Sequence, residues 1–323
     1  MNRLLIGESS DDMEAGHKDS AEALETVAKC DLCGGLDFVS ERYVKGWSLV
    51  KCIACGLVFT SPRRRAACLT EMYVHNYYEH DKDYLLAQLG ESTDEERRLV
   101  KWLSGMISSR AGSGSRRCLD VGCGAGKFVR EFMRGGWEAT GIDLSEKAVA
   151  LGLAQGLNLM TGDLSCRSLT TYDLISALHV IEHVHSPRAF LQQCASHLQD
   201  DGCLLLEIPD YGCRRSRQLG GSWPYLYPDS HLFQFTKETL TRYLEQSGFE
   251  RVECHQCHGM AWLEDYSTVA GTDRRKVQWK RRAFGCRHLI TWCPPLRTLV
   301  KRVIWEQLRY GEFLRVLARK RVG

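Results

Sequence analysis

Residues 120–126 read Asp-Val-Gly-Cys-Gly-Ala-Gly, and this stretch decides the fold. A short apolar run, residues 118–121, leads into it, and residues 128–133 carry apolar side chains at helical spacing after it. Glycines let the backbone approach a ligand closely, and a helix N-terminus offers unpaired N–H groups to an anion. The stretch therefore predicts a ligand-binding turn between a strand and a helix.

The spacing of the glycines excludes two common nucleotide sites. A dinucleotide fingerprint would need glycine at position 127, where Lys127 stands. A phosphate-binding P-loop would need glycine at 121 and Ser or Thr at 128, where Val121 and Phe128 stand. The turn therefore belongs to another class of site.

Strands and helices are predicted to alternate from residue 116 onward. The predicted strands cover residues 118–121, 137–142, 157–160, 172–178 and 203–208. Ser145 and the pair Ser186-Pro187 have the residue types that begin helices. The repeated alternation predicts an α/β fold with a doubly wound, mostly parallel sheet.

The pattern acidic-x-Gly-x-Gly-x-Gly resembles that of the class I S-adenosylmethionine-dependent methyltransferases, which have a Rossmann-like fold. The resemblance implies that the glycine loop holds the amino-acid part of the cofactor, that Asp143 binds the ribose and that Asp163 reaches the adenine. An N-cap is the alternative role for Asp143, although Ser145 is able to serve as that cap. The expected cofactor-binding residues are Asp120, Gly122, Gly124, Gly126, Asp143, Leu144, Asp163, Leu164 and His179.

Further motifs resemble a branch that modifies quinones, sugars and secondary metabolites. They are residues 172–174, 179–184, 207–210 and 227–236, and the similarity covers about residues 95–256. Asp210 stands where that branch usually has asparagine. The resemblance implies methyl transfer, to oxygen before nitrogen or carbon, on a small hydroxylated metabolite or a carrier-linked sugar. It also implies an antiparallel last strand, at residues 312–320.

Four cysteines form two closely spaced pairs near the N-terminus: Cys30 with Cys33, and Cys52 with Cys55. Thiolates two residues apart on a tight turn reach one tetrahedral ion, and two such pairs at this separation are typical of a zinc site. The stretch resembles the zinc ribbon of some sugar methyltransferases. An iron–sulfur centre and an empty pair of knuckles are the alternatives. Residues 249–254 are predicted to form a late strand, and no second ligand pair is evident, so residues 254–258 (Cys-His-Gln-Cys-His) are not predicted to bind a metal.

Three histidines are candidates for the base that takes the proton from the acceptor. His179 closes the predicted fourth strand, and His183 follows one helical turn later. His231 lies in an aromatic segment of the kind that forms a substrate-facing wall, with Tyr227 and Asp229 nearby to orient it. We therefore assign the base to His231 first and to His179 or His183 second.

Charge and hydropathy constrain the partners. Residues 274–321 hold fifteen Lys or Arg against two acids, and apolar residues at helical spacing lie among them. We expect this helix to pack on the core, with contact to an anionic membrane as the alternative. No run of about 18 apolar residues occurs, so we expect a cytoplasmic protein. We expect no nucleic-acid partner; an RNA methyltransferase and a non-catalytic zinc-ribbon binding module are the rival functions.

The predicted organisation has six parts: a disordered leader (1–22), a zinc-ribbon-like module (23–63), a helical connector (64–110), a methyltransferase core (111–256), a basic amphipathic insertion (257–311) and a final strand with tail (312–323). The module and the methyltransferase core are expected to have separate hydrophobic cores. Loss of Cys30 would then leave cofactor affinity nearly intact.

Overall fold

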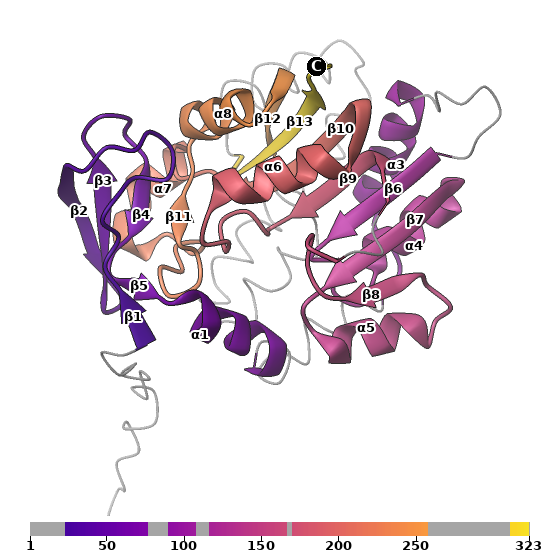
Figure 1. Cartoon of the computed structure of the whole chain (residues 1–323), viewed down its shortest axis with the longest axis horizontal. Coiled ribbons are helices and arrows are strands. Elements are labelled where there is room, and N and C mark those ends of the chain that lie inside the picture. The colour runs from indigo at the N-terminus through magenta and orange to yellow at the C-terminus, as the bar shows by residue number, and fades with distance from the viewer. Residues whose placement is uncertain (1–22, 77–89, 108–115, 167–169, 258–310, 323) are drawn as a thin grey trace, which may run out of the picture.

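A computed structural model describes residues 23–76, 90–107, 116–166, 170–257 and 311–322 (Figure 1). The predicted leader and nearly all of the basic insertion lie outside the described residues, as does His258. Among the described helices, none combines the length and the apolar composition that a membrane crossing needs.

The main sheet has seven strands in the order β12-β13-β10-β9-β6-β7-β8. Their bounds are β6 Arg116–Val121, β7 Trp137–Asp143, β8 Leu159–Thr161, β9 Tyr172–Leu178, β10 Leu198–Pro209, β12 Phe249–Cys257 and β13 Phe313–Lys320. β6 to β10 are parallel to one another, and β13 is antiparallel to both of its neighbours. The α/β fold class and the antiparallel last strand are therefore confirmed.

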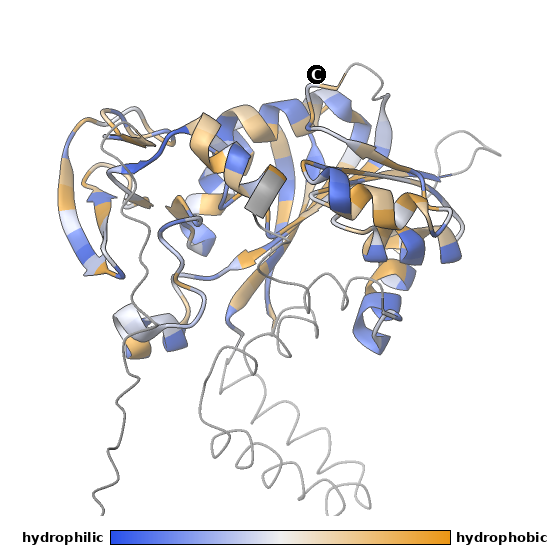
Figure 2. Ribbon diagram, turned by 90° about the horizontal axis from the view of Figure 1, so that it is seen from below, coloured by the Kyte–Doolittle hydropathy of each residue, from blue (hydrophilic) through white to orange (hydrophobic). Residues whose placement is uncertain are grey.

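Helices cover both faces of this sheet. One face carries α3 (Asp94–Met106), α4 (Lys127–Arg134) and α5 (Glu146–Leu153), and the other carries α6 (Pro187–His197) and α8 (Lys237–Gln246). The shorter α7 (Arg214–Leu219) and the 3₁₀ turn η3 (Gly220–Ser222) follow β10. Figure 2 shows hydrophobic residues concentrated along the strands between these layers. The core of the domain therefore lies on both sides of the sheet.

Local sequence signals start these helices where they were predicted. The Ser145 hydroxyl accepts a hydrogen bond from the Ala148 N–H, and Ser186 caps α6 with Pro187 in its first turn. Thr93 and Glu96 form a capping box at α3. Because Ser145 is the cap of α5, the carboxylate of Asp143 is left for another role.

A second, four-stranded sheet forms at the N-terminal end of the chain (Figure 1). Its order is β11-β4-β3-β2, with β2 Phe38–Val44, β3 Trp47–Cys52, β4 Val58–Thr60 and β11 Phe233–Gln234. Strands β2, β3 and β4 come from the cysteine-rich module, and β11 comes from the segment between β10 and α8. The module therefore shares a sheet with a segment that is remote in sequence.

The expectation of separate cores was wrong. Cys30, Leu32 and Phe59 of the module belong to one buried cluster with Leu119 and Leu240 of the main domain. The reason is that this side of the main sheet is only partly covered by α6 and α8, and the apolar residues of the module complete its burial.

The connector begins later than predicted. Residues 63–64 form β5, which pairs antiparallel with β1 (Leu24–Glu25). The helix α1 then covers Ala66–Glu71 and continues as a π-helical turn, Met72–Asn76. The start of the connector is therefore held by strand pairing with the N-terminal module.

Candidate functional site

The glycine loop follows β6 and is tightly confined. Gly122, Gly124 and Gly126 have φ angles of +69°, +54° and +83°, a region that glycine adopts at little cost. A Cβ on Gly122 would lie 2.6 Å from Cγ2 of Val180. The backbone of the loop therefore comes close to the turn after β9, at the point where the order of strands reverses between β6 and β9.

Two acids lie beneath this loop. The Asp143 carboxylate accepts hydrogen bonds of 2.8 Å from the Gly124 N–H and the Ser145 N–H, and burial raises its pKa. Asp120 accepts a 2.7 Å hydrogen bond from the Ser176 hydroxyl, and burial raises its pKa to about 7. Each carboxylate oxygen of Asp143 has a second lone pair, with which it can accept a ribose hydroxyl.

The remaining predicted cofactor residues line the same edge of the sheet. Leu144, half-buried, follows β7 directly. Asp163 follows β8 and accepts hydrogen bonds from the N–H and the hydroxyl of Ser165, while Leu164 beside it is buried. The Asp163 carboxylate can accept a hydrogen bond from an amine, and the apolar Leu164 beside it suits the face of an aromatic ring. Together they suit an aromatic amine such as adenine.

His179 lies at the end of β9 between two buried carboxylates. Its Nδ1 is 3.4 Å from Oε1 of Glu182, and its Nε2 is 3.5 Å from Oε1 of Glu207. Burial disfavours the charged imidazole, but the two carboxylates outweigh it and raise the pKa of His179 to about 9. Arg315 of β13 forms a 2.6 Å ion pair with Glu207. His179 is therefore an imidazolium at neutral pH, which has no lone pair with which to accept a proton.

His183 and His231 lie next to each other. Their ring centroids are 4.6 Å apart at an angle of 78°, and the Tyr227 ring lies 5.3 Å from that of His231. Burial lowers the pKa of both imidazoles, that of His231 to about 3. Both rings are therefore neutral at neutral pH and keep a free lone pair, but the low pKa makes His231 a weak base until a nearby carboxylate stabilises the charge that the ring gains.

Glu182 completes this group. Potential ligand atoms of Glu182, His183 and His231 all lie within 4.8 Å of one another. Glu182 is almost fully buried, and among the described residues the partner of its carboxylate is the His179 imidazole at 3.4 Å. Two imidazoles and a carboxylate at these distances can share a proton or bind a divalent cation.

The four predicted metal ligands come together. Sγ atoms of Cys30 and Cys55 are 3.5 Å apart, as are those of Cys33 and Cys52, and all four lie within 4.8 Å of one another. Thiolates bound to one tetrahedral Zn²⁺ lie about 3.8 Å apart. Burial raises the pKa of the Cys30 and Cys55 thiols, whereas desolvation of Cys33 is outweighed by hydrogen bonds, first that from the Gly35 N–H, which lower the pKa of this thiol. The cluster therefore fits a closed zinc site.

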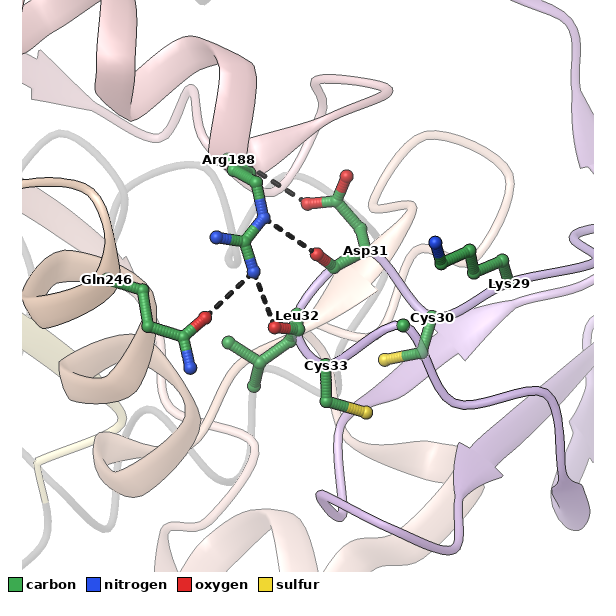
Figure 3. A pocket seen from close by; sticks show the side chains of 8 residues that line it. Lys29, Cys30, Asp31, Leu32, Cys33, Arg188 and Gln246 are labelled. Atoms are coloured by element: carbon green, nitrogen blue, oxygen red, sulfur yellow. Dashed lines mark hydrogen bonds between the residues drawn. The ribbon is translucent and has the colours of Figure 1, made fainter.

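A cleft of about 620 Å³ lies where the first cysteine pair meets the main domain (Figure 3). The Arg188 guanidinium donates to the carbonyl oxygens of Asp31 and Leu32 and to the side chain of Gln246. The Asp31 carboxylate accepts hydrogen bonds from the Arg188 N–H and the Ser186 hydroxyl at the start of α6. This cleft is a junction between module and domain, and its lining contains none of the predicted cofactor residues or base candidates.

Several residues of the site were not predicted as functional. Glu207 was noticed only within a motif, and Glu182 only as part of residues 179–184. Tyr73, whose hydroxyl is 2.6 Å from Nδ1 of His183, was not predicted to belong to the site. The signal that could have found Glu182 and Glu207 is the rarity of carboxylates in strongly apolar segments.

Comparisons with known proteins agree with this geometry. A family model described as a methyltransferase domain matches residues 76–254, more than half of the chain. The ubiquinone biosynthesis O-methyltransferase of Bordetella avium (strain 197N) is 30% identical to this chain over 112 residues. That of Bordetella bronchiseptica (strain ATCC BAA-588 / NCTC 13252 / RB50) is 33% identical to it over 108 residues. These matches cover 32% and 30% of this chain and 45% of each relative, so the chain spans less than half the length of the curated relatives it matches.

A solved structure shares the fold. Phosphoethanolamine N-methyltransferase 2 of Haemonchus contortus, in complex with S-adenosyl-L-methionine, superimposes with a TM-score of 0.50 at 11% identity. The superposition covers 89% of this chain and 71% of that one.

Proposed function

Because the chain belongs to the S-adenosylmethionine-dependent methyltransferases, we propose that it transfers a methyl group to an oxygen atom of a small hydroxylated molecule. The observation that carries the proposal is the pair of neutral imidazoles, His183 and His231, in a cluster that the Gly122–Val180 contact links to the glycine loop. Neutral imidazoles have a free lone pair, with which they can take a proton from a hydroxyl acceptor.

The cofactor, when bound, supplies an electrophilic methyl group on a sulfonium. The confined backbone of residues 122–126 suits the amino-acid end of such a ligand, and Asp143 suits its ribose. In the proposed reaction the acceptor oxygen would take this methyl group, and the sulfonium sulfur would keep the electron pair of the carbon–sulfur bond. The acceptor proton leaves to a base of the protein. Most of the catalysis by this chain would consist of aligning the two partners in a site shielded from water.

We assign the base to His231. Its pKa is lowered chiefly by burial and next by His183, so the imidazole is unprotonated when the acceptor arrives. The carboxylate of Glu182 opposes that lowering, and it would stabilise the positive charge that the ring gains with the proton. His179 is suited to a different role, because it is already charged and sits between Glu182 and Glu207.

Two observations support a phenolic ring as the methyl acceptor. The relatives with matching sequence are named for O-methylation in ubiquinone biosynthesis. The segment between β10 and α8 carries aromatic side chains near His231, among them Tyr225 and Tyr227, which suit a flat, hydroxylated ring. A catechol-like phenol is thus the first acceptor to test, and a carrier-linked sugar is the second. We assign the four-cysteine cluster a structural zinc ion, since all four positions of a tetrahedral site would be filled by protein ligands.

The test is methyl transfer from labelled S-adenosylmethionine to a panel of catechols, quinols, sugars and RNA. We expect label in a catechol or quinol. Label in RNA alone would overturn the small-molecule proposal, and no transfer to any class would favour a non-catalytic binding module.

The base is tested with the accepting molecule identified in that panel. We expect His231→Ala to lower kcat by about 10²-fold or more with unchanged cofactor affinity. Normal turnover in His231→Ala, together with a loss in His183→Ala, would move the base to the turn after β9.

A further inference from the structure

One threonine of the cysteine-rich module contacts the chain on both sides of His231. The Thr60 side chain is completely buried, and its hydroxyl lies 3.0 Å from the carbonyl oxygen of Pro228 and 3.5 Å from that of His231. Its backbone N–H donates a 2.9 Å hydrogen bond to the carbonyl oxygen of Leu232. Thr60 therefore fixes the peptide groups before, at and after His231.

Strand pairing extends this contact. In the β4–β11 pair, Phe59 lies opposite Phe233 and Val58 lies opposite Gln234. The Gln234 side chain donates to the same His231 carbonyl oxygen at 2.9 Å. The Phe233 N–H donates to the carbonyl oxygen of Glu182, at 3.3 Å. The same short strand therefore connects the module to both halves of the histidine cluster.

The second cysteine pair determines where β4 begins. The Gly56 N–H donates to the Cys52 carbonyl, and the Cys52 N–H donates to the Leu57 carbonyl, which closes the knuckle around Cys55. β4 starts at Val58, directly after this turn. The conformation of the knuckle is thus transmitted to Thr60 through a few residues of regular backbone.

We propose that Thr60 is a positioning residue, which holds His231 at the distance from the acceptor that proton transfer requires. This inference rests on the proposed function of His231. Through Thr60, the four-cysteine module takes part in the reaction geometry as well as in stability. A displacement of about 1 Å at a reacting group is enough to lower a rate by about 10²-fold, so a lost backbone anchor is a sufficient cause of lost turnover.

The structural alternative is that Thr60 only satisfies buried carbonyl groups. A positioning role and a purely structural role predict different effects on kcat when the hydroxyl is removed without a change of side-chain volume. Thr60→Val keeps the volume and removes the hydroxyl, whereas Thr60→Ser keeps the hydroxyl. The matched control is Thr241→Val, because Thr241 lies on α8, and its hydroxyl contacts the Cys254 sulfur at 3.8 Å, away from the histidines.

The experiment measures kcat, KM for both substrates, zinc content and amide hydrogen exchange of residues 228–234 in the full chain. We expect Thr60→Val to lower kcat by about 10-fold or more, with unchanged KM for the cofactor and full zinc content. Exchange of the His231 amide, which donates to the carbonyl oxygen of Tyr227 within the anchored segment, should become faster. Thr60→Ser should restore both properties, and Thr241→Val should match the parent protein.

Two results would overturn the inference. One is a normal kcat in Thr60→Val despite faster exchange at the His231 amide, which would leave Thr60 a purely structural role. The other is unchanged amide exchange of residues 228–234 in Thr60→Val, which would mean that the Thr60 hydroxyl does not hold this segment. If the parent protein transfers no methyl group at all, the proposed function fails, and the exchange measurement still decides whether Thr60 anchors the segment.

Discussion

The phenolic oxygen of Tyr73 lies 2.6 Å from Nδ1 of His183, and the carbonyl oxygen of Ser230 lies 3.0 Å from the same nitrogen. A carbonyl can only accept a hydrogen bond, so Nδ1 carries the imidazole proton and Nε2 keeps the lone pair. Tyr73 and Ser230 thus fix both the orientation and the tautomer of His183. Tyr73 lies in a π-helical turn, a conformation that is frequent at functional sites.

Tyr73→Phe should lower kcat by about fivefold, because the hydrogen bond that it removes contributes about 1 kcal/mol. The affinity for S-adenosylmethionine should stay the same, since the hydroxyl of Tyr73 bonds to His183, which is not one of the predicted cofactor residues. Steady-state kinetics with the identified acceptor measure this. The matched control is Tyr43→Phe, on an exposed tyrosine of β2. Equal effects of the two substitutions would contradict a role for Tyr73 at His183.

Asp143→Ala should weaken cofactor binding by about 2 to 4 kcal/mol, the scale of losing a charged hydrogen-bond partner. The carboxylate also accepts from the Gly124 N–H, so its loss frees the glycine loop at the same time. Titration calorimetry with S-adenosylmethionine measures the dissociation constant. Asp94→Ala, at an exposed acid of α3, is the control. An unchanged dissociation constant in Asp143→Ala would mean that the ribose binds elsewhere.

The protein should bind one zinc ion per chain, and Cys30→Ser should lose it. Because Cys30 belongs to the same buried cluster as residues of β6, we expect the whole chain to unfold at lower denaturant concentration in one transition. Metal analysis and denaturant unfolding measure the two effects. Cys68→Ser, on α1 outside the cluster, should keep the metal and the stability. Iron in the purified protein, or an unchanged unfolding curve for Cys30→Ser, would contradict the zinc assignment.

The charge of His179 should make the stability depend on alkaline pH. Its pKa in the folded state, about 9, lies above the ordinary value of 6.5, so the folded state binds the proton more tightly. The stabilisation is complete below pH 6.5 and is lost as the pH rises through 9, by about 1 to 3 kcal/mol.

Denaturant unfolding of the parent protein and of His179→Gln over this range of pH measures the effect. The parent protein should lose stability toward alkaline pH, and the variant should lose less. Parallel curves for the two proteins would mean that His179 is neutral in the folded state.

The features that the sequence predicted are those that depend on residues close together in the chain. The glycine loop and the caps Ser145 and Ser186 act within a few residues, and these elements begin where they were expected. The mostly parallel sheet followed from the alternation of strands and helices, and its antiparallel last strand followed from the methyltransferase resemblance.

The rest could not be predicted because it depends on contacts between remote segments. β4 and β11 are three and two residues long, too short for a periodic signal, and their pairing is set by packing. The ion pairs among His179, Glu182, Glu207 and Arg315 come from three different segments, and only the folded sheet brings them together.

The pairing of β4 with β11 also has a consequence for biosynthesis. Thr60 and Pro228 are 168 residues apart, so the ribosome releases the cysteine pairs long before it releases their partner strand. The knuckles can take up metal early, because all four thiols lie within residues 30–55, but the outer edge of β4 stays unpaired until β11 has been translated. An exposed strand edge is a template for wrong pairing with other chains. Heterologous production of this protein should therefore benefit from slow synthesis at low temperature, with zinc supplied from the start.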